Sequence, residues 1–279
     1  MTEGDSLVEL LKKHAHARGM YETLELNDYL LLHNLAILEL TPGPAFVNVT
    51  CLSLENNGLR NLVHLSSQFP RLKYLNVNHN LLSSLDFKDF CGLEDLQEIH
   101  AAHNSIQLLS SIDSGRCLTL KKLNLSHNKL TNFPHFCDFQ FLEVLDLSRN
   151  QIATEAECML SSLRNSLPST ILQLYLSPNA FIGDLKNYRK SILSMFDKLL
   201  FLDSAAVTHF DRQLATVELN EGKTAATLLT AQRNADAKNC MSDNMAKFRE
   251  FQAAFCPVQY ELDQLKLDIS SLCSQFTHL

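Results

Sequence analysis

One motif, repeated in phase along the middle of the 279-residue chain, constrains its fold more than any other feature. The pattern LxxLxLxxNxL, with other apolar residues at some leucine positions, fits six stretches, and its asparagine falls at Asn57, Asn80, Asn104, Asn128, Asn150 and Asn179. Successive asparagines are 23, 24, 24, 22 and 29 residues apart. A period of this length is typical of a chain that stacks copies of one structural unit.

Each copy of the motif predicts a short strand followed by a turn. The two leucines of LxL point to the same side of the strand because side chains alternate. One copy cannot bury its leucines alone, whereas stacked copies share a core and align their strands as a parallel sheet on the concave side. The asparagine amide can bond turn backbone groups that would otherwise be buried without a partner. We therefore predict a structural, non-catalytic role for the six asparagines.

The N-terminal end of the stack departs from the motif. Leu30 and Leu32 occupy the strand positions of a degenerate first copy, and Leu35 stands where the asparagine would be. End copies are expected to be atypical because one side faces no neighbour. Farther upstream, a capping box predicts a helix over about residues 6–17 that covers this end of the core.

The C-terminal end also departs from the motif. The longer interval before the sixth asparagine has apolar residues at helical spacing, which predicts a helix over residues 154–164. A further helix is predicted from Asn187 to about Phe196. Residues 199–203 then resemble a final half-copy that seals the core.

The region beyond the repeats predicts helices of a different kind. Residues 241–255 carry an apolar stripe, and Pro257 separates them from residues 258–276, whose apolar residues alternate at steps of four and three. Two helices joined at this proline could form a hairpin, pack on the repeats or pair with a partner, and packing within the chain is favoured. We therefore divide the chain into residues 1–29, 30–207 and 208–279.

Composition excludes several classes of function. The formal net charge of −7 argues against a nucleic-acid binder or a protein held on an anionic membrane. The acidic start lacks the pattern of a signal peptide. The eight cysteines include no CxxC pair, which favours buried, reduced thiols in a cytoplasmic protein over a disulfide framework.

The sequence contains no motif that indicates catalysis. It has no phosphate-binding loop, HExxH pair, nucleophile motif or paired-acid motif, so we expect neither an enzyme nor a cofactor. His79, His103 and His127 occupy the same position in three successive copies, an arrangement that could form a metal ladder. Because Ser-His-Asn is also a common sequence at this turn, we expect no functional metal.

A binding surface is predicted on the concave face. The residues that flank the buried leucine of each strand point to this face because side chains alternate. Tyrosines surrounded by polar side chains resemble the centre of a protein interface. The candidates are Tyr74, His100, Lys122, Asp146 and Tyr175. The alternative is that they are ordinary solvated residues of the sheet, with binding at an edge or on the convex side.

Segments at both ends of the repeats carry a family resemblance. The repeats resemble those of short leucine-rich-repeat proteins with a C-terminal cap. Met20-Tyr21 and the following Leu26-Asn27-Asp28 are similar to the N-terminal signature of the cytoplasmic assembly factors for axonemal dynein arms. Asn187-Tyr188-Arg189 and Asp211-Arg212 resemble the capping region of that family. Asn179-Ala180 departs from it, since members usually carry Asn-Pro there.

The resemblance implies both a fold and a function. The expected fold is an α/β leucine-rich-repeat solenoid with a parallel concave sheet, an N-terminal helical cap, a C-terminal repeat cap and a helical tail. The implied function is a monomeric, non-catalytic scaffold in the cytoplasm or near cilia and flagella, which helps to preassemble dynein chains together with chaperones. The alternative is another leucine-rich-repeat adaptor, such as a phosphatase-regulatory or spliceosomal scaffold.

Overall fold

A computed structural model describes residues 28–110, 119–153, 156–183, 185 and 187–255. The chain divides into two compact units, Met1–Ala215 and Thr216–Leu279. The predicted helix at residues 6–17 and the apolar seam of residues 258–276 lie outside the described residues.

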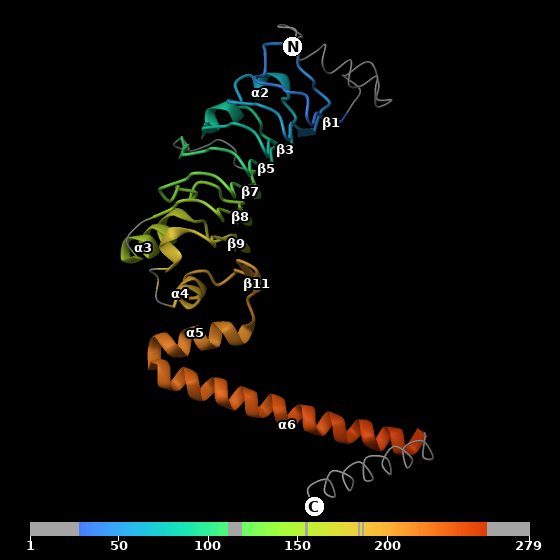
Figure 1. Cartoon of the computed structure of the whole chain (residues 1–279), viewed down its shortest axis with the longest axis vertical. Coiled ribbons are helices and arrows are strands. Elements are labelled where there is room, and N and C mark those ends of the chain that lie inside the picture. Colours follow the sequence, from blue (N-terminus) through green and yellow to red (C-terminus); the bar gives the residue numbers. More distant parts are fainter. Residues whose placement is uncertain (1–27, 111–118, 154–155, 184, 186, 256–279) are drawn as a thin grey trace, which may run out of the picture. The chain divides into compact units, whose positions relative to one another are not determined.

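The first unit is built on a sheet to which each copy of the motif contributes one strand (Figure 1). Its parallel strands are β1 (Tyr29–Leu31), β2 (Cys51–Ser53), β3 (Tyr74–Asn76), β5 (Glu98–His100), β7 (Lys122–Asn124), β8 (Val144–Asp146), β9 (Gln173–Tyr175) and β10 (Phe201–Leu202). The central leucines pair in register, from Leu30 opposite Leu52 to Leu145 opposite Leu174. β11 (Ala205–Ala206) ends the sheet antiparallel to β10. The predicted parallel sheet and final half-copy are therefore confirmed.

The segments between the strands form a layer of short, varied elements on the other side of the stack (Figure 1). They are α2 (Leu65–Gln68), β4 (Ser84–Leu85), the 3₁₀ helix η2 (Phe87–Phe90), β6 (Leu108–Leu109), α3 (Ala156–Ser166), the 3₁₀ helix η3 (Ala180–Gly183) and α4 (Tyr188–Met195). β4 and β6 pair in parallel as a small second sheet, which the sequence did not predict. α3 and α4 correspond to the two helices predicted around the last copy.

Leucines of the motif and phenylalanines of the opposite layer fill the core between them. Leu75 and Leu145 are fully buried, and so are Phe69 and Phe136. The rings of Phe46 and Phe69 stack with their centroids 5.3 Å apart. Burial of each such side chain stabilises the fold by about 1.5–3 kcal/mol relative to exposure.

The asparagine of each copy joins that copy to the preceding one. Oδ1 of Asn104 accepts the N–H of Leu82 at 3.1 Å, and its Nδ2 donates to the carbonyls of Val77 at 3.0 Å and Ala101 at 3.1 Å. Val77 belongs to the preceding copy and Ala101 to the same copy. Equivalent bonds are made by Asn57, Asn80, Asn128, Asn150 and Asn179. In the degenerate first copy, the N–H groups of Leu35 and Ile37 both donate to Oδ1 of Asn57.

The first half of α5 (His209–Glu221) contacts the C-terminal end of the repeats. Arg212 donates to the carbonyl of Phe196 at 3.0 Å and also to that of Leu199. Ala215 is buried in the same apolar core as the repeats. We propose that the cap continues through the first half of α5, beyond residue 207, because these contacts come from residues 208–215.

The second unit contains α6 (Lys223–Phe255), a single long helix. Gly222 separates it from α5 with a φ of 89°, a conformation that glycine adopts without strain. The sequence predicted helix here but not this break. Leu228, Met241 and Phe248 are exposed along α6. Among the helices that the structure describes, none is long and apolar enough to cross a membrane.

The prediction that the cysteines are buried is wrong for most of those that the structure describes. Cys91, Cys137 and Cys240 are exposed free thiols, and Cys51 is a half-buried one. The three exposed thiols lie in segments between strands or on α6, outside the core positions of the motif.

Replacing Asn104 with alanine removes the bonds that join two copies and leaves buried backbone groups without partners. We expect it to lower the free energy of unfolding by about 1–3 kcal/mol, as measured in urea. The exposed Asn61, replaced in the same way, serves as the control and should change stability much less. Equal stability of the Asn104→Ala variant and the parent would contradict a structural role for the asparagines.

Replacing Arg212 with alanine leaves the carbonyls of Phe196 and Leu199 without their charged donor. The expected loss is about 1–2 kcal/mol of unfolding free energy, seen as a lower melting temperature. Arg249→Ala, at an exposed position of α6, is the matched control and should leave the melting of the repeats unchanged. If the two variants melt alike, α5 is not part of the cap.

Candidate functional site

The sheet exposes two parallel rows of side chains on one face, which we call the sheet face. Strand register places one residue of each strand in each row because the leucine between them points into the core. The first row contains Tyr29, Cys51, Tyr74, Glu98, Lys122, Val144, Gln173 and Phe201. The second contains Leu31, Ser53, Asn76, His100, Asn124, Asp146 and Tyr175. All five candidate residues therefore lie on this face.

Three of the candidates gather around Glu98. Nζ of Lys122 lies 2.8 Å from Oε1 of Glu98, and Nε2 of His100 lies 3.5 Å from Oε2. The rings of Tyr74 and His100 are in contact, with their centroids 5.1 Å apart. Glu98 is not among the residues predicted from the sequence, although its position beside the buried Ile99 is equivalent to that of Tyr74.

The cluster alters the ionisation of its members. Partial burial favours the neutral form of Glu98, but hydrogen bonds and positive charge from Lys122 and His100 outweigh it and hold the pKa of Glu98 below its ordinary value. Burial, followed by the negative potential of Cys51 and Glu98, raises the pKa of Tyr74. Tyr74 is thus a protonated hydrogen-bond donor at neutral pH, whereas Glu98 is an ionised acceptor.

The other two candidates lie together farther along the sheet. Asp146 and Tyr175 are paired residues of β8 and β9. Oδ1 of Asp146 accepts the N–H of Ser148 at 2.9 Å, and the hydroxyl of Tyr175 donates to Gln173 at 3.3 Å. Tyr74 is four strand spacings from Tyr175 in the sheet order, roughly 19 Å at about 4.8 Å per spacing. The two tyrosines are therefore well separated along the sheet face.

Some residues that alternation predicts to be exposed on this face are buried. Ser53, Ala102 and Ser126 are 3%, 5% and 7% exposed, respectively. Their side chains are short and end below their longer neighbours. Oδ1 of Asn78, for example, reaches across to accept the N–H of Ala102. Strand alternation predicts the direction in which a side chain points, but not whether residues of the next copy shield it from solvent.

Two aromatic residues on the first row are also absent from the residues predicted from the sequence. Tyr29 is 53% exposed and Phe201 is 41% exposed, and they lie in the two outer parallel strands. The same alternation that identified Tyr74 would have identified them. They lie in the degenerate first copy and the final half-copy, where departure from the motif predicts a capping role and gives no sign of a binding one.

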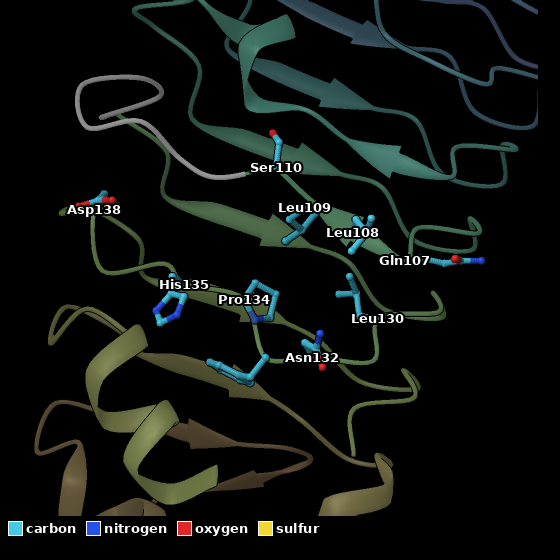
Figure 2. A pocket seen from close by; sticks show the side chains of 10 residues that line it. Gln107, Leu108, Leu109, Ser110, Leu130, Asn132, Pro134, His135 and Asp138 are labelled. Atoms are coloured by element: carbon cyan, nitrogen blue, oxygen red, sulfur yellow. The ribbon is translucent and has the colours of Figure 1, made fainter. Parts of the chain in front are cut away.

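A separate apolar hollow of about 390 Å³ opens between β6 and the segment at residues 130–138 (Figure 2). Its lining includes Leu108, Leu109, Pro134 and His135. Nδ1 of His135 lies 2.8 Å from Oγ of Ser166, an arrangement that resembles a nucleophile and its base. Ser166 is fully buried, so its hydroxyl cannot reach a substrate in this conformation.

No cluster suited to a metal ion appears in the part of the chain that the structure describes, since no three His, Cys, Asp or Glu side chains gather closely enough there. The histidines of the predicted ladder do lie side by side. The ring centroid of His103 lies 4.2 Å from that of His79 and 3.9 Å from that of His127. The rings stack almost parallel, so their nitrogen lone pairs do not converge on one ion.

Comparison with known proteins identifies the repeats. The family model described as Leucine rich repeat matches residues 47–106, and a second leucine-rich-repeat model matches residues 119–139. Lumican of Oryctolagus cuniculus is 36% identical over 45% of this chain and 59% of its own length. Adenylate cyclase of Schizosaccharomyces pombe is 25% identical over 72% of this chain but only 12% of its own length. The chain thus spans less than two thirds of either relative.

One solved structure that the chain resembles is internalin C2 of Listeria monocytogenes. The match covers 69% of this chain and 81% of that protein, with 19% identity and a TM-score of 0.49.

Replacing Lys122 with alanine should raise the pKa of Glu98, because Glu98 loses a hydrogen bond and a positive charge. Nuclear magnetic resonance titration of its carboxyl carbon measures the shift. Since the folded-state pKa is depressed, the pair stabilises the fold above the unfolded-state pKa, and this contribution is lost as the pH falls through the folded-state value. At neutral pH, the free energy of unfolding of the Lys122→Ala variant should be less than about 1 kcal/mol below that of the parent, because the ion pair is largely exposed.

Lys121→Ala, at the neighbouring exposed position, is the control and should leave the titration of Glu98 unchanged. An unchanged titration in the Lys122→Ala variant would show that the ion pair does not form.

Proposed function

We propose that this leucine-rich-repeat chain is a non-catalytic scaffold that binds a protein partner on the sheet face. Leucine-rich repeats are protein-binding modules, and the family models match residues 47–106 and 119–139, which hold four of the six motif copies. The observation that most supports the sheet face is its two rows of exposed and half-buried side chains, aromatic and charged ones among them, on a hydrogen-bonded parallel sheet. A rigid frame reduces the entropy lost when a partner binds.

Tyr74 and Tyr175 are the proposed anchors of the interface. Each is half-buried and lies beside polar residues, the environment in which tyrosine contributes most to protein interfaces. Their separation across the intervening strands suits a protein surface better than a small molecule. His100, Lys122 and Asp146 lie between them and would orient a partner and raise the association rate through their charges.

At a finer level, we propose that the partner is an axonemal dynein chain handled together with chaperones in the cytoplasm. The support is the resemblance of the end motifs. In the structure, Arg189 lies 3.5 Å from Asp211, and Arg212 bonds carbonyls at the end of the stack. These motif residues build the cap, so their resemblance supports membership in a capped subclass more directly than it supports a particular partner.

Co-purification from ciliated cells tests this proposal. Recovery of dynein chains and chaperones with the full chain would support it. Recovery of phosphatase subunits or splicing factors in their place would favour the second candidate, a regulatory or spliceosomal adaptor, and would contradict the dynein proposal.

Replacing Tyr74 or Tyr175 with alanine should weaken binding of the recovered partner by about 1–3 kcal/mol each, without strict additivity. Both side chains point away from the leucine core, so melting temperatures should change little. The dissociation constant, measured by titration calorimetry, is the readout. His100→Ala, Lys122→Ala and Asp146→Ala should each have a smaller effect.

Phe141→Ala provides a matched control, because Phe141 is an aromatic residue that is 55% exposed outside the two rows. It should bind as the parent does. If the double tyrosine variant binds normally while removal of residues 223–279, which leaves the contacts of Arg212 and Ala215 in place, abolishes binding, recognition belongs to the C-terminal region and the proposed role of the sheet face is wrong.

A further inference from the structure

A column of side chains runs along the turns that leave the strands, at the position before five of the six motif asparagines and before Leu35 of the degenerate first copy. Its members share a left-handed backbone with φ between 54° and 60°, and they are Asn34, Asn56, His79, His103, His127 and Arg149. Asparagine and histidine adopt this conformation more readily than most residues other than glycine. The column therefore follows from the same turn that places each asparagine in the core.

The column is held rigidly in place. The backbone N–H groups of His79, His103 and His127 donate to carbonyls of the following copy at 3.0, 3.1 and 3.0 Å. Successive imidazoles stack with interplanar angles of 11° and 19°. At the N-terminal end of the column, Asn56 donates to the side chain of Asn34. The three rings thus form an ordered and largely exposed stack.

The surroundings of the stack are positively charged or neutral. Arg149 and Lys129 line a shallow open depression together with the three histidines, and the described lining residues include no carboxylate. Partial burial, followed by positive charge from His127, His79 and Arg149, lowers the pKa of His103. Without a counter-charge, protonation of the stack is therefore opposed by its own members.

We propose that the histidine column is a second binding site, separate from the sheet face, that takes an acidic segment of a protein partner and holds it more tightly as the histidines become protonated. The imidazoles, Arg149 and Lys129 together offer a line of N–H donors with no competing carboxylate in its lining. An acidic segment supplies the missing counter-charge.

A polypeptide suits the site better than a nucleic acid or a metal. The chain has a net charge of −7, which repels the dense negative charge of a nucleic acid as a whole. A short acidic segment interacts mainly with the nearby cationic side chains, because salt screens the more distant charges. The near-parallel rings follow one another at centroid distances of 4.2 and 3.9 Å, a spacing that suits a series of carboxylates rather than one ion.

Binding and protonation must be linked. A bound carboxylate raises the pKa of each histidine that it contacts, so the complex holds more protons than the free protein. Affinity therefore rises as the pH falls through the range in which the histidines titrate, and binding takes up protons.

The test uses the full chain and a fluorescently labelled oligo-aspartate peptide, followed by anisotropy at about pH 7.5 and about pH 5.5, on either side of the ordinary histidine pKa. We expect the affinity of the parent to rise on the order of tenfold at the lower pH, within the usual range of coupling between linked equilibria. Calorimetry in two buffers should record proton uptake.

The variant with His79→Asn, His103→Asn and His127→Asn should lose this rise. Asparagine suits the left-handed backbone, as it does at Asn34 and Asn56, so the fold should survive, and thermal melting checks this. His64→Asn is the matched control, because His64 is also exposed and left-handed, with a φ of 72°, but lies outside the column. It should behave as the parent does.

The proposal is overturned if oligo-aspartate fails to bind at either pH, or if the triple variant keeps the full pH dependence. It is also overturned if duplex DNA binds through the column while oligo-aspartate does not. The variant with Tyr74→Ala and Tyr175→Ala should bind oligo-aspartate normally, so failure of this site is distinguishable from failure of the sheet face.

Discussion

The turn that follows each strand constrains this structure more than any other feature, because it bends the chain beside an apolar core. Its backbone groups lie where water cannot reach them, and the asparagine amide supplies partners in two successive copies at once. The residue before the asparagine adopts a left-handed backbone at five of the six turns, and at the sixth it is Pro178. The buried motif asparagines and the exposed histidine column are thus two results of one turn. Any substitution that removes the bonds of a motif asparagine should therefore also disturb the neighbouring residue of the column.

The same stacking organises the sheet face. Because the central leucines pair in register from β1 to β10, the residues on either side of them fall into two straight rows. Charges that are distant in sequence, such as Glu98 and Lys122, meet at 2.8 Å because they occupy one row in neighbouring strands. The face therefore presents its aromatic and charged side chains in a fixed arrangement before a partner binds. Such preorganisation favours specific recognition at a modest cost in entropy.

The repeat pattern predicts this fold well because core positions are dictated by burial, which the spacing of leucines and asparagines reports directly. It also predicts α3, α4 and the half-copy at β10. It does not report contacts between long side chains of different copies, so the Glu98 cluster and the exposed Tyr29 and Phe201 were missed. The short residue Ser53 was expected in solvent and is covered. Gly222 ends α5 through a local φ that an apolar pattern cannot predict.

The central claim, that the partner binds across the sheet face, is tested most directly by hydroxyl-radical footprinting of the free chain and of the complex with its co-purified partner. This method reports the solvent access of individual aromatic and sulfur-containing side chains. The account predicts strong protection of Tyr74 and Tyr175 in the complex, with Phe141 and the exposed Met241 of α6 modified as in the free chain. Protection of Met241 with unchanged modification of both tyrosines would contradict it and would place recognition on the second unit.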